Sequence, residues 1–194
     1  RANPYAQREA KRPAHHDPTP RGMLRHWNEV AIDASGLDHV PVSLGEPRIF
    51  GEQLGPARAS RAMAIVHIAV FDAVNAIAHR YRSYAGLPAA THDASMEAAI
   101  AQAAHDTLSA LFPSQQAAFD EQLALDLDAV HGWRQKQLGI ELGRRAAEAI
   151  LALRADDGGF RTEIAVGVDL HLDAAIAENA FGHDRDHVDT VDIR

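Results

Sequence analysis

The sequence predicts an all-α protein: a bundle of about five helices with a buried central helix, an irregular N-terminal arm and an acidic C-terminal tail. Three observations favour this class. Apolar residues recur every three or four positions in successive segments. Proline and glycine mark the joints between those segments. The segment 58–77 is apolar almost all round, which is typical of a helix covered on most sides.

The first helix is expected to begin at Pro20, with Thr19 as its N-cap, and to end at Gly36. Its apolar positions recur at helical spacing and are Met23, Trp27, Val30 and Ala34. The glycine- and proline-rich stretch 36–57 then reads as a long connection. A loop of that length in a compact domain is usually functional or fixed to the fold.

The segment 58–77 is expected to be the central helix. Its most apolar face carries Met63, Val66, Val70, Val74 and Ile77. Arg61, Asp72 and Asn75 fall near one another on the opposite side, because 11 and 14 residues are close to whole helical turns. Buried polar groups need partners, so we expect Arg61 and Asp72 to form an ion pair or a capping network rather than a catalytic site.

Three further helices are predicted, ending near Phe112, at Gly132 and near Arg154. Asp93 or Ser95 is expected to cap the first of them. Gly139 and Gly143 lie one turn apart in the last helix and lower its propensity. Close approach of a neighbouring helix would compensate for that cost.

The chain divides by sequence into an extended arm (residues 1–21), a helical bundle (22–159) and an acidic tail (160–194). Residues 164–172 alternate with period two as in a strand, although a helix over 169–180 fits about as well. The net charge of -8 is uneven, with +4 on residues 1–26 and -5 on residues 160–194. Only the basic arm could attract an anion.

Composition excludes several classes of function. The chain of 194 residues contains no cysteine, which excludes disulfides, thiolate metal sites and a catalytic thiol. An acidic chain without a basic stripe is a poor candidate for binding nucleic acid. No apolar run approaches the roughly 18 residues of a membrane span, so we expect a soluble protein. The chain begins at Arg1 without a signal-peptide pattern, so we expect its natural start to lie elsewhere.

The densest group of metal-ligating residue types is His183, Asp184, Asp186 and His187. On a helix the two histidines would share a face, as metal ligands can. The favoured alternative is a solvated acidic tail. His67 lies on the apolar face of the segment 58–77, where a satisfied core histidine is favoured over a ligand or base. No catalytic, cofactor-binding or metal residue is therefore assigned.

Residues 54–77, LGPARASRAMAIVHIAVFDAVNAI, resemble the N-terminal helical region of bacterial and algal vanadium-dependent haloperoxidases. These enzymes belong to the wider type-2 phosphatidic acid phosphatase group. The stretch WNEVAIDA from Trp27 resembles the first helix of that region. The stretch LFPSQ from Leu111 and the helix ending in ILALRADDG continue the match in the same order. The resemblance spans about residues 22–158 and implies a helical bundle.

The resemblance also implies where the chemistry of such enzymes lies. Their vanadate sits in a second, C-terminal half, held by a Lys followed by Arg-Pro, a Ser-Gly-His and an Arg-x-x-x-Gly-x-His. This chain lacks those motifs: Lys11-Arg12-Pro13 has the wrong spacing, Ser35-Gly36 precedes Leu37, and Gly182-His183 lacks the Arg. We therefore expect this chain to bind no cofactor, with vanadate held only in a complete family member.

Three functions stay open. The first is the N-terminal half of a haloperoxidase-like protein, packed against a C-terminal half outside this chain. The second is a non-catalytic helical module for self-association or partner binding, with Gly139 and Gly143 as a close-packing surface. The third is a small metal-binding protein that uses His183 and His187.

Overall fold

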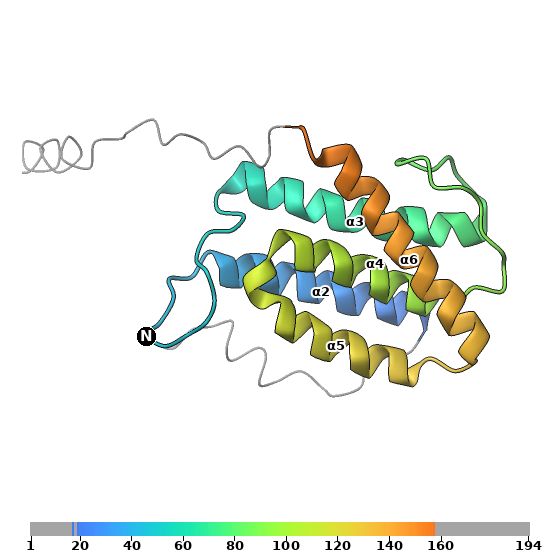
Figure 1. The fold of residues 1–194 in the computed structure, drawn as a ribbon, viewed down its shortest axis with the longest axis horizontal. Helices are drawn as coiled ribbons and strands as arrows, with labels where there is room; N and C mark the ends of the chain where they lie inside the picture. The colour runs from blue at the N-terminus through green and yellow to red at the C-terminus, as the bar shows by residue number, and fades with distance from the viewer. Residues whose placement is uncertain (1–16, 18, 158–194) are drawn as a thin grey trace, which may run out of the picture. The chain divides into compact units, whose positions relative to one another are not determined.

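A computed structural model describes residue 17 and residues 19–157 of the chain, and it confirms the all-α helical bundle. Figure 1 shows the five α-helices of this part, which contains no strand. They are α2 (Pro20–Asp38), α3 (Pro56–Ala78), α4 (Met96–Leu111), α5 (Gln116–Ala129) and α6 (Trp133–Arg154). A short 3-10 turn, η1 (Pro113–Gln115), precedes α5.

Local sequence signals account for most helix ends. Thr19 caps α2, because its side chain accepts a hydrogen bond from the backbone N–H of Gly22 at 3.1 Å. Ser95, rather than Asp93, caps α4 in the same way through Ala98 N–H. Gly36 does not end α2, which continues to Asp38. The reason is tertiary, since the buried Asp38 carboxylate accepts hydrogen bonds from the backbone N–H groups of Glu52 and Gln53.

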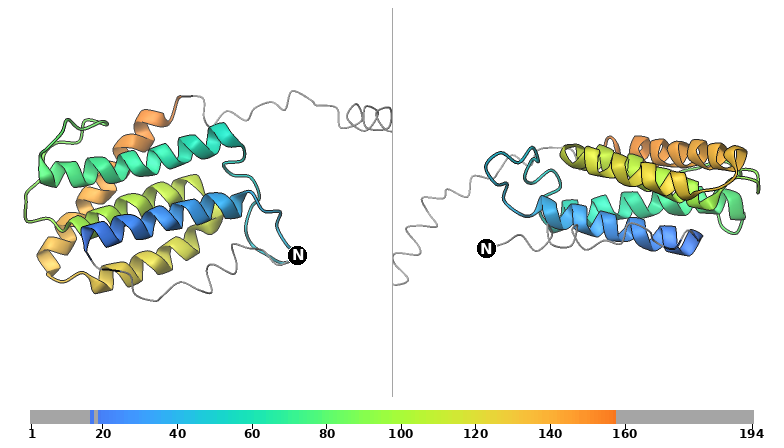
Figure 2. Two further views of the ribbon diagram at one scale, coloured as in Figure 1. Left: turned by 180° about the vertical axis from the view of Figure 1, so that it is seen from behind. Right: turned by 90° about the horizontal axis from the view of Figure 1, so that it is seen from below.

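The central helix is α4, and the prediction that residues 58–77 would occupy this place was wrong. Eleven of the sixteen residues of α4 are buried, whereas α3 buries ten of twenty-three. The helix α4 packs against α2, α3, α5 and α6. In the right-hand view of Figure 2, α2 and α3 lie on one side of the bundle and α5 and α6 on the other. Both hydrophobic segments were found from sequence, but composition alone did not show which one is surrounded.

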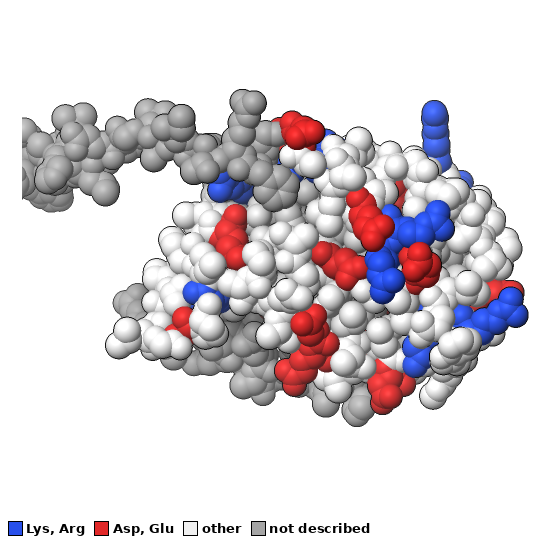
Figure 3. All heavy atoms as spheres, in the orientation of Figure 1, with Lys and Arg blue, Asp and Glu red and all other residues white. Residues whose placement is uncertain are grey.

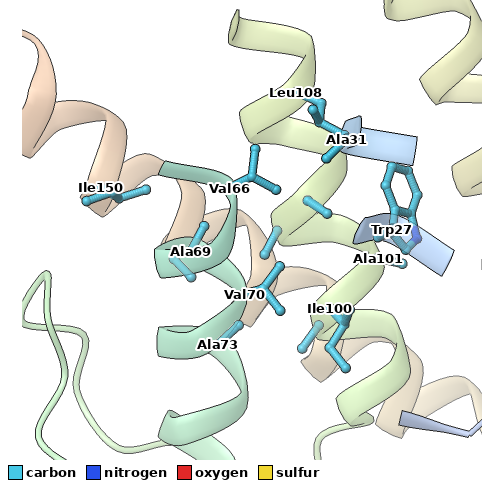
Figure 4. Packing of buried hydrophobic residues seen from close by; sticks show 14 of the residues in the cluster. Trp27, Ala31, Val66, Ala69, Val70, Ala73, Ile100, Ala101, Leu108 and Ile150 are labelled. Carbon is cyan, nitrogen blue, oxygen red and sulfur yellow. The ribbon is translucent and has the colours of Figure 1, made fainter. Parts of the chain in front are cut away.

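Small side chains let α4 hold this central position. Figure 4 shows Ile100, Ala101 and Leu108 of α4 among side chains from three other helices. Trp27 and Ala31 come from α2, Val66, Ala69, Val70 and Ala73 from α3, and Ile150 from α6. Alanine shortens the distance between helix axes, so that several helices can reach one another around α4. The large side chain of Trp27, which is 1% exposed, fills space that the small side chains leave.

Gly139 and Gly143 of α6 face α4, as the sequence predicted for a close helix contact. A Cβ added at Gly143 would lie 2.6 Å from the backbone oxygen of Ala99 and 2.8 Å from Cβ of Gln102. A Cβ at Gly139 would collide with the backbone of Ser95. The two glycines are buried in this chain's own α4–α6 contact. They are therefore not a free surface for self-association, as the second hypothesis had assumed.

The connection between α2 and α3 is fixed to the bundle at several points. The buried Arg48 donates hydrogen bonds to the carbonyl oxygens of Leu37 and Val40. The side-chain amide of Gln53 donates to the carbonyl oxygen of Leu111 at 3.0 Å, and the Glu52 carboxylate accepts from Ser114. These contacts tie the loop to both α2 and the C-terminal end of α4. A loop of this length is usually functional or fixed to the fold, and these contacts fix this loop to the fold.

Candidate functional site

The three polar residues of α3 do not form one cluster. Arg61 binds Asp157, with 2.7 Å between Nη2 and Oδ1, and it also donates to the carbonyl oxygen of Arg154. The expected pair of Arg61 with Asp72 is therefore wrong. Eleven residues place the two on the same side of α3 but about 16 Å apart along its axis, so their side chains cannot meet.

Asp72 and Asn75 instead hold the segment that follows α3. The Asp72 carboxylate, 1% exposed, accepts hydrogen bonds from the backbone N–H groups of Tyr84 and Ala85, both at 2.7 Å. Asn75 donates to the carbonyl oxygen of Tyr81 and accepts from its N–H. This is the capping network considered as the alternative to an ion pair. Its role is to fold the chain back after the left-handed residue His79 that ends α3.

His67 was expected to be a core histidine, and that expectation was wrong. Its side chain is exposed on α3. The helix has two apolar sides, and the side that carries His67 is not the side that faces α4. Helical spacing identifies residues that share a face, but it does not say which of two apolar faces is covered.

The helices α4 and α5 meet at a histidine that the sequence argument did not single out. His105 Nδ1 lies 2.7 Å from Asp106 Oδ1, and His105 Nε2 lies 2.7 Å from Asp120 Oδ1. Gln102 donates a further hydrogen bond to Asp106. The signal available in the sequence is position: His105 lies four residues after Ala101 and three before Leu108, on the buried stripe of its helix.

Two opposing effects set the charge of His105. Burial of the imidazole opposes protonation, but the hydrogen bonds to Asp106 and Asp120 outweigh it and raise the pKa of His105 above its ordinary value of 6.5. When the ring is protonated, both of its nitrogens donate hydrogen bonds to the two carboxylates. An imidazolium with both N–H groups occupied has no lone pair for a metal or a proton. In this state His105 joins α4 to α5.

A second histidine–carboxylate contact lies between α2 and α5. His26 Nε2 is 3.6 Å from Asp126 Oδ2, and Asp126 is 1% exposed. Asp126 Oδ1 also accepts a hydrogen bond from Gln122 at 3.3 Å. Trp27 lies between the two histidines, with its ring edge-on to those of His26 and His105. Two aspartates of α5, Asp120 and Asp126, thus each contact a histidine of a different helix.

The bundle has two hollows at the end where α3 finishes. One, of about 560 Å³, is lined by His92, Asp93, Glu97 and His131 together with residues from all five described helices. Its polar side chains lie at the rim, where His92 and His131 are exposed. Within the described residues there is no group of three or more His, Asp or Glu side chains placed to hold a metal ion.

The other hollow, of about 440 Å³, is almost entirely apolar. It lies between α2 and α3 and is lined by Leu24, Phe71, Val74, Tyr81 and Met96, with His67 and Arg80 also present. Most of its lining is apolar, so it offers binding surface for an apolar group. In Figure 3, which shows the face of Figure 1, acidic and basic side chains are interspersed over α6.

The hollow continues along an exposed stripe of α3, which is the least ordinary surface of the described bundle. Seven residues at alternating spacings of three and four are not buried: Ala57, Ser60, Ala64, His67, Phe71, Val74 and Ala78. We call these seven residues the α3 stripe. Between Arg61 and Arg80 the only Asp, Glu, Lys or Arg is Asp72, which is buried.

By length and composition α3 could also cross a membrane, since its best 18-residue window has a mean hydropathy of 1.5. However, 56% of that window is buried inside the bundle, and core helices of soluble proteins pass the same test.

The remaining metal-site candidates from the sequence belong to the C-terminal tail. His183 and His187 lie outside the described residues, and so do the tail segments considered as strand or helix. No known protein family, curated protein or solved structure matches this chain in the three comparisons made. The feature of the described residues that the fold itself does not explain is therefore the α3 stripe, which is mostly apolar and not buried.

Proposed function

We propose that this chain is a non-catalytic helical support module, the N-terminal half of a vanadium haloperoxidase-like protein, and that its α3 stripe takes up another layer of helices. The observation that carries the proposal is the stripe itself. Its seven residues follow the spacing by which one helix packs along another. Its flanking positions include Met63 and Ile68, which are only partly buried, so the apolar surface is wider than the stripe alone.

The chemistry of the described residues agrees with a supporting role. An oxyanion such as vanadate needs clustered cations and backbone donors. Arg48 and Arg61 are instead engaged in contacts within the fold, and His105 is held between two carboxylates. The sequence resemblance ends near residue 158, close to the end of α6, so it covers the helical support and not the motifs of the second half.

The reading frame of the gene tests the identity of the module. We expect a Lys followed by Arg-Pro, then a Ser-Gly-His motif, encoded downstream of residue 194. A reading frame that closes without them would overturn the haloperoxidase-like assignment.

An activity assay tests the absence of catalysis. The 194-residue chain, supplied with vanadate, bromide and hydrogen peroxide, is expected to brominate an indicator dye no faster than vanadate alone. Vanadate-dependent bromination above that blank would show that the chain itself holds a catalytic site, and the support role would be wrong.

A further inference from the structure

We propose that the α3 stripe is a self-complementary surface on which a second copy of this chain docks, with the two α3 helices antiparallel and His67 at the two-fold axis. The inference rests on the proposed use of the stripe for docking and names its occupant. It starts from the order of the seven residues along the helix, which is not symmetric in size.

Around His67 the stripe is asymmetric in size, with smaller residues before it and larger ones after it, while Ala57 and Ala78 at its two ends are both small. Ala57, Ser60 and Ala64 precede His67, whereas Phe71 and Val74 follow it. Phe71 is 40% exposed although it is one of the largest apolar side chains on α3. The hollow beside it, lined also by Leu24 and Tyr81, continues the apolar surface at the same end.

An antiparallel pair about His67 matches large residues with small ones. Phe71 of one copy then faces Ala64 of the other, and Val74 faces Ser60, because each pair lies at nearly equal distances on either side of residue 67. Small residues at such contacts allow the close axial distances of packed helices. A parallel pair would set Phe71 against Phe71 and Ala64 against Ala64, which leaves one end crowded and the other end open.

Charge does not oppose this pairing along its centre. From residue 62 to residue 79 no Asp, Glu, Lys or Arg side chain is exposed, so the only ionisable side chains that the pairing brings together at its centre are the two His67 rings. Figure 2, in the view from behind, shows α3 beside α2 on one side of the bundle, opposite the side of α5 and α6. The surface offered to a second copy is thus helical and, apart from Ser60 and His67, apolar.

Single cysteines test the geometry, because the chain has none of its own. In the proposed pair, His67→Cys brings two sulfurs together at the axis and should give a disulfide-linked dimer under mild oxidation. Ala57→Cys should not, because the two copies of residue 57 would be about 30 Å apart, far beyond the roughly 7 Å reach of a disulfide. Mixing Ala64→Cys with Phe71→Cys should give the mixed dimer in excess of either homodimer.

The same experiment separates the alternatives. Equal cross-linking at residues 57 and 67 would indicate a parallel or random contact and would overturn the antiparallel arrangement. Absence of cross-linking at 67, together with a monomer mass by light scattering, would overturn the second copy as occupant. In that case haloperoxidase motifs in the reading frame would still support the proposed function. The proposed dimer and the proposed function can therefore fail separately.

A charge placed in the stripe provides an independent readout. Ala64→Glu is expected to convert the dimer to a monomer in light scattering, because two carboxylates would be buried against the partner's Phe71. Ala124→Glu on α5 is the matched control, since Ala124 is also an exposed alanine within a helix. Equal masses for the two variants, whether both dimeric or both monomeric, would contradict the proposal.

Discussion

His105 on α4 and Asp120 on α5 are joined by a contact of 2.7 Å between Nε2 and Oδ1. The other ring nitrogen of His105 is held by Asp106 of its own helix. His105 therefore links α5 to the central helix, and the link includes an ion pair when the imidazole is protonated. This is unusual support for a helix in a bundle, since α5 buries only Phe119 and Asp126.

Stability is expected to fall with rising pH because of His105. Its pKa is higher in the folded chain than the ordinary 6.5, because the hydrogen bonds to Asp106 and Asp120 outweigh burial. The folded state thus holds the proton more tightly. The stabilisation is fully present below pH 6.5 and is lost as pH rises through the raised folded pKa. Thermal melts between about pH 5.5 and pH 8.5 measure the effect.

His105→Gln should abolish that part of the pH dependence and lower the unfolding free energy at acidic pH by about 1–3 kcal/mol. His131→Gln serves as control, because His131 is exposed and should leave the profile unchanged. A His105→Gln variant that keeps the wild-type dependence would show that another group is responsible.

Gly143→Ala should destabilise the bundle although alanine is the better helix former. The added Cβ would lie 2.6 Å from the Ala99 carbonyl oxygen, and backbone cannot move aside cheaply. We expect a loss of about 1–3 kcal/mol in urea unfolding. Gln137→Ala, at an exposed position of the same helix, is the control and should change the unfolding free energy little. Stabilisation by Gly143→Ala would mean that α4 and α6 are further apart than described.

Asp72→Asn should loosen the segment after α3 more than it lowers global stability. An amide cannot accept both the Tyr84 and Ala85 N–H groups with two oxygens, so one of them loses its partner. Arg80 and Arg82 in this segment are exposed and are trypsin sites. Cleavage there should be several-fold faster in the variant. Asp93→Asn, at an exposed residue, should cleave at the wild-type rate.

Arg61→Gln should weaken the attachment of the C-terminal end of α6. The lost contacts are the ion pair with Asp157 and the hydrogen bond to the Arg154 carbonyl. The pair is partly exposed, so we expect a cost of about 1 kcal/mol that shrinks at high salt. Arg144→Gln removes an exposed i,i+3 pair on α6 and should cost less. Equal losses would show that Arg61 adds no tertiary attachment.

Sequence periodicity was sufficient to predict the helices, because helix formation depends on neighbours three and four residues away. Ser95 and Thr19 acted as caps for the same local reason. The central position of α4 was missed because it depends on what surrounds a helix. A long apolar segment such as α3 looks equally buried whether its second face meets this chain or another.

Helical spacing likewise did not identify the partners in the polar contacts between distant parts of the chain. Asp72 finds its partners twelve and thirteen residues away, and Arg61 finds Asp157 ninety-six residues away. Neither partner is marked by spacing within a helix. His105 could have been placed on the buried stripe of its helix, but its partner Asp120 becomes visible only when α5 is laid against α4.

The attachment of α5 has a consequence for how the bundle opens. The helix α5 is held by one buried aromatic residue, the partly buried Leu123 and two histidine–aspartate contacts, so we expect its free energy of local unfolding to be lower than that of α4. In native-state hydrogen exchange, the α5 amides should exchange through a sub-global opening while those of α4 wait for global unfolding. Raising the pH should widen that gap, so α5 would behave as a separate cooperative unit within a small bundle.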